Sequence, residues 1–160
     1  MDRRALLDRY AAGYDAVVDA LAGVTDAELD VRPADGGWTA RECVHHLADS
    51  EARSMLRLRQ LLADDDPVIE GYDQDEWARR LPYDGPVDEP LAVVRAVRAL
   101  SMATLRTLTE EQWSRAGRHP EHDEPYSVAR WLELYAEHPH EHAAQITAAR
   151  SSGGAPLALS

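Results

Sequence analysis

Apolar side chains recur at intervals of three and four residues along four separate stretches of this chain. In residues 2–21 they are Leu6, Tyr10, Tyr14, Val17 and Leu21. This spacing lines one face of an α-helix, whereas a strand would alternate apolar and polar residues, and the sequence shows no such alternation. The pattern predicts an all-α fold, a four-helix bundle with long connections.

The predicted helices have recognisable starts. Thr39 and Glu42 form a capping box, in which the threonine hydroxyl accepts from the glutamate backbone N–H and the glutamate carboxylate bonds back. Ser127 is a good N-cap for the last helix. Periodicity, glycine and proline then predict three further long helices at 39–63, 90–108 and 127–152, a short helix at 73–80, a turn after Thr109, and loops at 25–37, 64–87 and 117–126.

Length and charge limit the kinds of protein this can be. A chain of 160 residues predicts one domain, residues 1–152, followed by a flexible tail at 153–160. The formal net charge of −12 argues against nucleic acid or an anionic membrane as a partner. No apolar run reaches the ~20 residues of a membrane span. The single cysteine, Cys43, excludes an internal disulfide and fits a reducing compartment, so we expect a cytoplasmic protein.

Two histidines one turn apart carry the clearest chemical information. His138 and His142 lie at positions i and i+4 of the last predicted helix, so both imidazoles can reach one point. On a helical wheel His142 falls within the apolar face and His138 at its edge, whereas His140 lies about 120° away and is expected to face solvent. Such a pair supplies two ligands of a three-histidine metal site. The alternative is two core histidines, each with its own hydrogen-bond partner.

The third ligand has to come from another helix. His45 and His46 lie in the second predicted helix, and the apolar periodicity does not distinguish between them. Cys43, one turn before His46, is a possible thiolate ligand, although a lone helical cysteine is more often a small core residue. His119 and His122 are expected in a loop beside Pro120, where they are candidate pocket-edge residues, with an ordinary surface loop as the alternative.

Pro139 interrupts the pattern between the paired histidines. A proline removes the helical hydrogen bond to the carbonyl four residues earlier, so a kink is expected near Tyr135, with a tolerated bend of no functional meaning as the alternative. A carboxylate that orients a ligating histidine is also expected. The candidates are Glu42, Asp49 and Glu141.

Several motifs resemble the DinB-like superfamily, in the same order along the chain. The signature around its second helix is similar to Gly36-Gly-Trp-Thr-Ala-Arg-Glu-Cys-Val-His-His-Leu-Ala-Asp-Ser50. Tyr72-Asp73 followed by Trp77, the His119-Pro120 step and residues 135–147 with their histidines also resemble it. The resemblance covers about residues 25–150 and is closest to the branch of bacillithiol transferases and proteins named "putative metal-dependent hydrolase".

This resemblance implies a bundle that holds a divalent metal, zinc or nickel, on His46, His138 and His142. Three protein ligands leave coordination positions open, as in a catalytic site. The resemblance favours a metal-dependent thiol S-transferase, which joins a low-molecular-weight thiol to an electrophilic small-molecule substrate. A hydrolase on the same site and a non-catalytic metal-binding stress-response protein are the alternatives.

The resemblance also implies a thiol partner and supporting residues. The thiol is expected to be bacillithiol, or mycothiol if the absence of lysine among the 17 basic residues reflects a GC-rich bacterium. A homodimer is expected by analogy with relatives. The candidate supporting residues fall on or near the two long loops and are Tyr72, Asp73, Trp77 and His119.

Overall fold

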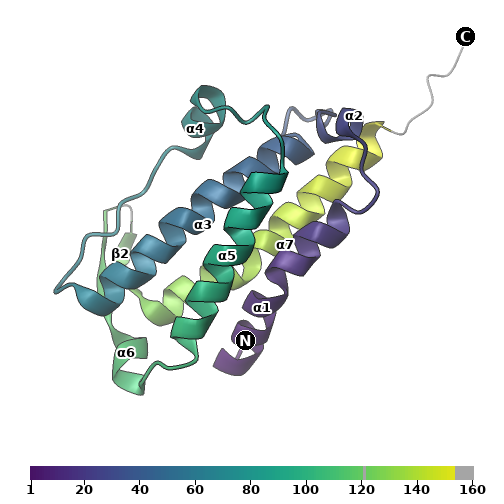
Figure 1. Ribbon diagram of the computed structural model, residues 1–160. Coiled ribbons are helices and arrows are strands. Elements are labelled where there is room, and N and C mark those ends of the chain that lie inside the picture. Colours follow the sequence, from purple (N-terminus) through teal and green to yellow (C-terminus); the bar gives the residue numbers. More distant parts are fainter. Residues whose placement is uncertain (121, 154–160) are drawn as a thin grey trace, which may run out of the picture.

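Four amphipathic helices bury their apolar faces against one another (Figure 1). The computed structural model describes residues 1–120 and 122–153. Within these ranges the long helices are α1 (Arg3–Ala20), α3 (Ala40–Ala63), α5 (Asp88–Leu105) and α7 (Val128–Gly153). Helix α1 packs on α5 and α7, and α3 packs on the same two helices. The predicted four-helix bundle is confirmed.

The connections between the long helices carry the short elements. Helix α2 (Asp26–Leu29) follows α1, α4 (Gln74–Arg80) lies between α3 and α5, and α6 (Glu110–Ser114) follows α5. Two strands, β1 (Ala116–His119) and β2 (His122–Ser127), pair antiparallel directly before α7. Figure 1 shows α4 and the hairpin on the same side of the bundle, with α4 near one end and α6 near the other.

The core consists of two clusters of buried side chains. In one, Trp131 and Tyr10 are 0% exposed, and their ring centroids lie 5.5 Å apart. The Trp131 indole N–H donates to the Ser54 carbonyl oxygen at 2.8 Å. In the other, Leu47 and Ile146 are fully buried. Burying a side chain of this size contributes about 1.5–3 kcal/mol, so the predicted apolar faces are the surfaces that hold the bundle together.

Both predicted helix starts are confirmed. Thr39 Oγ1 accepts from the backbone N–H of Glu42 at 3.1 Å, and the backbone N–H of Thr39 donates to Glu42 Oε2 at 2.8 Å. Ser127 Oγ accepts from the backbone N–H of Arg130 at 3.0 Å. An N-cap of this kind contributes about 1 kcal/mol. These caps fix where α3 and α7 begin, and with them the register of the histidines.

Two of the predicted loops contain regular structure, and the prediction is wrong there. Within 25–37, helix α2 is capped by the Thr25 hydroxyl. In the second predicted loop, residues 117–119 belong to β1 and residues 122–126 to β2, with a register shift between Gly117 and His119. Strands of four and six residues with such an irregularity are too short for apolar alternation to be visible in the sequence.

Helix α7 includes Pro139 and ends at Gly153. Because proline has no N–H, the Tyr135 carbonyl lacks its usual helical donor. The Arg98 guanidinium of α5 donates to it instead, with Nη1 3.2 Å from the oxygen. A kink near Tyr135 stays a prediction. Gly153 belongs to the helix and not to the predicted tail, and the rest of that tail, residues 154–160, lies outside the described residues.

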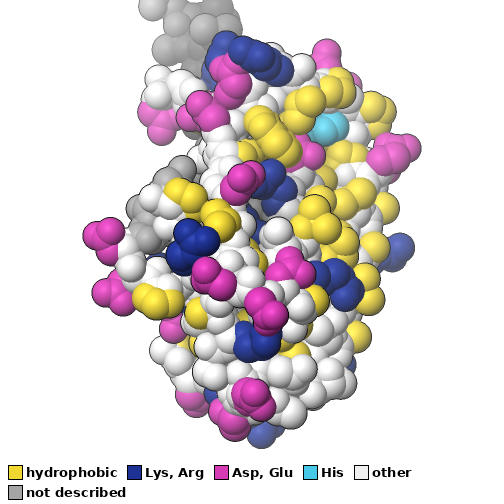
Figure 2. All heavy atoms as spheres, turned by 90° about the vertical axis from the view of Figure 1, so that its left-hand side faces the viewer, with side chains coloured by type: hydrophobic (Ala, Val, Ile, Leu, Met, Phe, Trp, Pro, Cys, Tyr) yellow, Lys and Arg dark blue, Asp and Glu magenta, His cyan; other side chains and the backbone are white. Residues whose placement is uncertain are grey.

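The surface on the side of α4 and the hairpin is mixed in character. Figure 2 shows acidic, basic and apolar side chains interspersed there, so charge of one sign does not dominate this face. In the described ranges no helix combines the length and the apolar character that crossing a membrane requires.

Candidate metal centre

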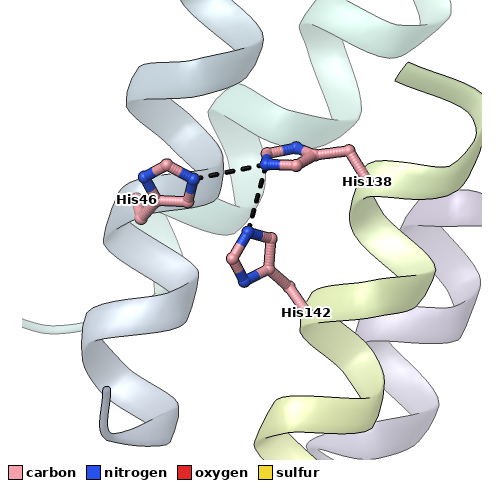
Figure 3. A group of neighbouring side chains, drawn as sticks. All are labelled: His46, His138 and His142. Atoms are coloured by element: carbon pink, nitrogen blue, oxygen red, sulfur yellow. Dashed lines mark hydrogen bonds between the residues drawn. The ribbon is translucent and has the colours of Figure 1, made fainter. Parts of the chain in front are cut away.

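Three histidine side chains converge between α3 and α7 (Figure 3). His46 comes from α3, and His138 and His142 come from successive turns of α7. The Nε2 atom of His138 lies 3.3 Å from that of His46 and 3.1 Å from that of His142. The three possible ligand atoms all lie within 4.8 Å of one another. His46 and His138 are 92 positions apart in the sequence, and they nevertheless present nitrogens to one point.

These separations fit a single metal ion. A zinc–imidazole bond is about 2.0–2.1 Å long, so two nitrogens of a tetrahedral site lie about 3.3 Å apart. The separations of 3.1 and 3.3 Å are close to that value. Among the residues that the structure describes, these histidines form the one group of three or more His, Cys, Asp or Glu side chains suited to hold an ion.

Burial keeps the three imidazoles neutral, which is the form that binds a metal. His46 is 1% exposed. Desolvation, with the neighbouring His142 as a smaller cause, lowers the pKa of His46 to about 3. Desolvation also lowers the pKa of His142 and takes the pKa of His138 well below its usual value. At neutral pH the cluster therefore carries no charge of its own.

The hydrogen bonds within the cluster leave lone pairs without donors. His142 Nδ1 donates to Gln145 Oε1 at 2.8 Å, so its Nε2 presents a lone pair to the other two rings. A neutral imidazole carries one N–H, so His138 Nε2 can donate to only one of its two neighbours. A cation at the centre satisfies all three nitrogens at once. The residues present therefore fit a bound divalent metal.

The alternative of ordinary core histidines fits less well. That interpretation requires a separate hydrogen-bond partner for each buried ring. In the described part of the chain His46 Nδ1 and His138 Nδ1 are buried and have none. Within the described ranges, the hydrogen-bond contacts of the Nε2 atoms of these two residues are with other imidazoles.

Trp38 and Gln145 contact rings of the cluster, and neither was singled out from the sequence. The Trp38 ring lies 4.6 Å from that of His46 and 6.1 Å from that of His142, nearly parallel to the latter. Gln145 Oε1 also accepts from the buried Cys43 thiol at 3.7 Å. Burial raises the pKa of this thiol to about 12, so it stays protonated and outside the cluster. The position of Gln145 three residues after His142, on the same helix face, could have pointed to its role.

Two cavities adjoin the cluster, and we call them cavity A and cavity B. Cavity A has a volume of about 440 Å³ and is lined by residues that include His46, His138, Tyr72, Arg57, Tyr135 and Glu141. Cavity B has a volume of about 320 Å³ and is lined by residues that include His142, Trp38, Gln145, Pro33 and Asp75. Gln74, the first residue of α4, lines both. Volumes of about 300–1,000 Å³ are usual for small-molecule sites.

Only one predicted supporting residue of the α4 region lines a cavity at the cluster. Tyr72 lines cavity A, and its ring centroid lies 6.5 Å from that of His46. Trp77 packs on Tyr72 at 4.6 Å. Asp73 is the N-cap of α4, where its Oδ1 accepts from a backbone N–H of the first turn at 2.8 Å. Asp73 and Trp77 therefore shape the loop that holds Tyr72.

His119 lies away from the cluster, in the hairpin. It is 7% exposed, and its ring centroid lies 5.6 Å from that of Tyr126. The expected surface loop is wrong for His119, because β1 carries this side chain into the protein. It belongs to neither the wall of cavity A nor that of cavity B. The side chain of His122 lies outside the described residues.

The remaining two histidines make separate contacts. His45 Nε2 donates to the Gly85 carbonyl oxygen at 3.1 Å, so of the adjacent pair only His46 joins the cluster. His140 does not face solvent freely as predicted. It is half-buried, and its Nε2 donates to the Arg9 carbonyl oxygen at 3.0 Å, because α1 packs against that side of α7.

An amide takes the place of the expected orienting carboxylate. Glu42 closes the capping box of α3, Asp49 accepts from a tyrosine hydroxyl at 2.7 Å, and Glu141 lines cavity A. Gln145 Oε1 instead accepts from Nδ1 of His142, whose Nε2 points into the cluster. A carboxamide oxygen fixes the imidazole tautomer as a carboxylate would, without adding a negative charge.

Known proteins resemble this chain in sequence and in fold. The Bacillus subtilis protein named "Putative metal-dependent hydrolase YfiT" is 39% identical over 127 residues, which is 78% of this chain and 70% of that protein. The Oceanobacillus iheyensis protein "Putative metal-dependent hydrolase OB0782" is 34% identical over 124 residues, 78% of this chain and 72% of that protein. The solved structure of YfiT, described as an unusual four-helix bundle, has a TM-score of 0.87 and 31% identity over 96% of this chain and 90% of that one.

The family itself is defined by a match over most of the chain. The family model described as "DinB superfamily" matches residues 9–146, a range that includes all three clustered histidines. The observed bundle and the relatives named above agree with this match. The chain therefore belongs to the DinB superfamily.

Proposed function

We propose that this protein is a metal-dependent transferase that joins a low-molecular-weight thiol to an electrophilic small molecule. The observation that carries the proposal is that two separate cavities, A and B, adjoin one three-histidine cluster. A transfer between two molecules requires both to be held at one centre, and two cavities provide that arrangement. The proposed metal is zinc or nickel on His46, His138 and His142.

The metal and the protein have distinct tasks in this proposal. A divalent cation lowers the pKa of a thiol or water that it binds and so supplies a nucleophile at neutral pH. The three neutral imidazoles hold the cation without cancelling its charge, and Gln145 fixes the tautomer of His142. Trp38 covers the rings of His46 and His142 and limits access of water there. Burial raises the pKa of Tyr72 to about 12, so its hydroxyl can donate a hydrogen bond to a ligand in cavity A.

A hydrolase on the same centre is the second candidate. The names of the relatives in B. subtilis and O. iheyensis favour it. Water would then take the open position that a thiol takes in the first proposal. A non-catalytic metal-binding role is less well supported, because the cluster in the described residues offers three protein ligands and not four.

Metal content tests the site itself. Purified protein is expected to carry about one equivalent of zinc or nickel, and His142→Ala is expected to lose most of it, since chelation by three imidazoles is replaced by chelation by two. The matched control is His140→Ala, which removes a histidine of the same helix that lies outside the cluster. Equal metal content in the wild-type protein and His142→Ala would contradict the site.

A substrate panel separates the two candidate reactions. The metal-loaded protein is mixed with bacillithiol, mycothiol, cysteine or glutathione and a chlorinated nitroaromatic acceptor, and thioether formation is followed by absorbance. The transferase proposal expects a thioether with at least one thiol and none with His142→Ala. Ester or amide cleavage in the absence of any thiol, with no thioether from the panel, would favour the hydrolase instead.

A further inference from the structure

A buried ion pair lies in the bundle core, apart from the histidine cluster. Arg98 of α5 is 4% exposed, Glu51 of α3 is 0% exposed, and Arg98 Nη1 donates to Glu51 Oε1. Taking both charges out of water costs several kcal/mol per ion, and such pairs are often no more stabilising than apolar residues of the same size. Stability alone therefore does not explain why this pair is there.

Two of the nitrogens of Arg98 also donate to backbone carbonyls. Nη1 also donates to the Tyr135 carbonyl of α7 at 3.2 Å, and Nη2 donates to the Tyr10 carbonyl of α1. The guanidinium carbon lies 3.8 Å from the centroid of the Tyr10 ring. With Glu51 on α3, a single side chain of α5 thus contacts the other three long helices.

The Tyr135 carbonyl is the one that Pro139 deprives of its helical donor. The turn between Tyr135 and Pro139 carries His138. In an ordinary helix the N–H of residue 139 would restrain this turn, and here the Arg98 side chain does so. A buried carbonyl left without any donor would cost about 1–3 kcal/mol. The geometry of one histidine of the cluster therefore depends on a side chain from another helix.

The packing around this turn is matched to Arg98. A Cβ atom at Gly13 of α1 would lie 2.7 Å from Arg98 Nη2 and 3.0 Å from Pro139 Cγ. A larger residue at position 13 would push the guanidinium or the proline ring away. Gly13, Arg98 and Pro139 thus fit together as a set beside the turn that carries His138.

We propose that Arg98 and Glu51 are positioning residues for the metal site. Glu51 anchors the guanidinium to α3, which also carries His46, and the guanidinium holds the turn of α7 that carries His138. This bridge sets the placement of His138 relative to His46, whose Nε2 atoms lie 3.3 Å apart. The inference rests on the proposed metal site.

The test first removes the Glu51–Arg98 pair, and then gives the Tyr135 carbonyl a backbone N–H donor in place of Arg98. The double variant Glu51→Leu/Arg98→Met leaves no unpaired buried charge. It is expected to stay helical by circular dichroism, but to bind Co²⁺ about tenfold more weakly in a visible-absorption titration. Adding Pro139→Ala gives residue 139 an N–H for the Tyr135 carbonyl, so the affinity for Co²⁺ is expected to return toward that of the wild type. A purely structural role of the ion pair would not give this rescue.

The controls separate this inference from the proposed function. Arg95→Met, at an exposed position of the same helix, is expected to bind Co²⁺ like the wild type. The positioning role would be overturned if Glu51→Leu/Arg98→Met bound Co²⁺ as tightly as the wild type, or if Pro139→Ala did not restore the lost affinity. Neither result would contradict the metal site itself. Absence of Co²⁺ binding by the wild type would overturn the metal site and the inference together.

A second variant covers the case in which the double variant does not fold. Arg98→Lys keeps a positive charge beside Glu51, but an ammonium has no planar fork that reaches both the carboxylate and the Tyr135 carbonyl. The same loss of Co²⁺ affinity and the same rescue by Pro139→Ala are expected. Wild-type affinity in Arg98→Lys would contradict the bridge.

Discussion

The proton positions on the ring nitrogens decide what the three histidines can bind. The Gln145 amide settles this for His142, because Oε1 can only accept and so places the proton on Nδ1. His46 and His138 have no Nδ1 partner in the described part of the chain. Their orientation depends on packing, as in the contact between the rings of Trp38 and His46. One imidazole of the cluster is therefore held by a hydrogen bond, and the other two are held by the packing around them.

Replacing Gln145 by leucine is expected to weaken metal binding about 10- to 100-fold. Without the amide oxygen, His142 can place its proton on Nε2, and that tautomer cannot bind the ion. A competition titration of Zn²⁺ against a chromophoric chelator measures the change. Gln60→Leu, at an exposed position of α3, is the matched control. Equal affinity in the two variants would show that the amide does not fix the tautomer.

Helical periodicity in the sequence was enough to predict two of the three histidines of the cluster. The spacing alone selected His138 and His142 over His140, and these are the two that the structure brings together. The choice of His46 needed the family resemblance, because the apolar face did not separate it from its neighbour. The helical spacing also places Gln145 on the same face as His142, but the hydrogen bond between them depends on the direction of the amide side chain, which the spacing does not give.

At the scale of whole elements, local rules worked for the long helices and failed for the hairpin. The capping box at Thr39 and the N-cap at Ser127 are encoded within four residues each, so both could be predicted. The hairpin depends on a distant segment, because the Arg118 N–H donates to the Pro67 carbonyl at 2.8 Å and the Ile69 N–H donates to the Arg118 carbonyl at 2.7 Å. A contact across about fifty residues leaves no pattern in a short window of sequence.

Gly117→Ala is expected to destabilise this region by about 1–3 kcal/mol, as overpacking does. A Cβ atom at Gly117 would lie 2.4 Å from the Pro67 carbonyl oxygen, which is backbone and cannot swing aside. Urea denaturation measures the change in free energy of unfolding. In the control Gly85→Ala the nearest atom would lie 3.4 Å away, and a smaller effect is expected. Equal stability of both variants would contradict this packing.

At the scale of the whole molecule, the candidate metal site exists only when the bundle is assembled. His46 and His138 are 92 positions apart, and they meet because α3 and α7 pack together. An unfolded chain presents no such group of nitrogens, so a metal bound at this candidate site would stabilise the folded protein. In the absence of metal, the burial of three neutral imidazoles makes the stability of the folded protein depend on pH.

Acid is expected to destabilise the metal-free protein through these histidines. Folding lowers the pKa of His46 from 6.5 to about 3, and lowers those of His138 and His142 in the same direction. As the pH falls from about 6.5 toward 3, the unfolded chain binds protons that the folded protein does not, so the free energy of unfolding decreases through this window. At about pH 5 each histidine that stays neutral lowers it by about 2 kcal/mol relative to neutral pH.

Urea denaturation of chelator-treated protein at about pH 7 and pH 5 measures this loss. His46→Gln removes one titrating group from the cluster and is expected to lose about 2 kcal/mol less between the two conditions than the wild type. The comparison uses the change in the free energy of unfolding between the two pH values and not its value at neutral pH. A substitution that only weakens the core lowers the free energy of unfolding at both pH values, and so would not produce this result. An identical pH dependence in the two proteins would assign the acid sensitivity to other groups and would mean that His46 takes up a proton in the folded state.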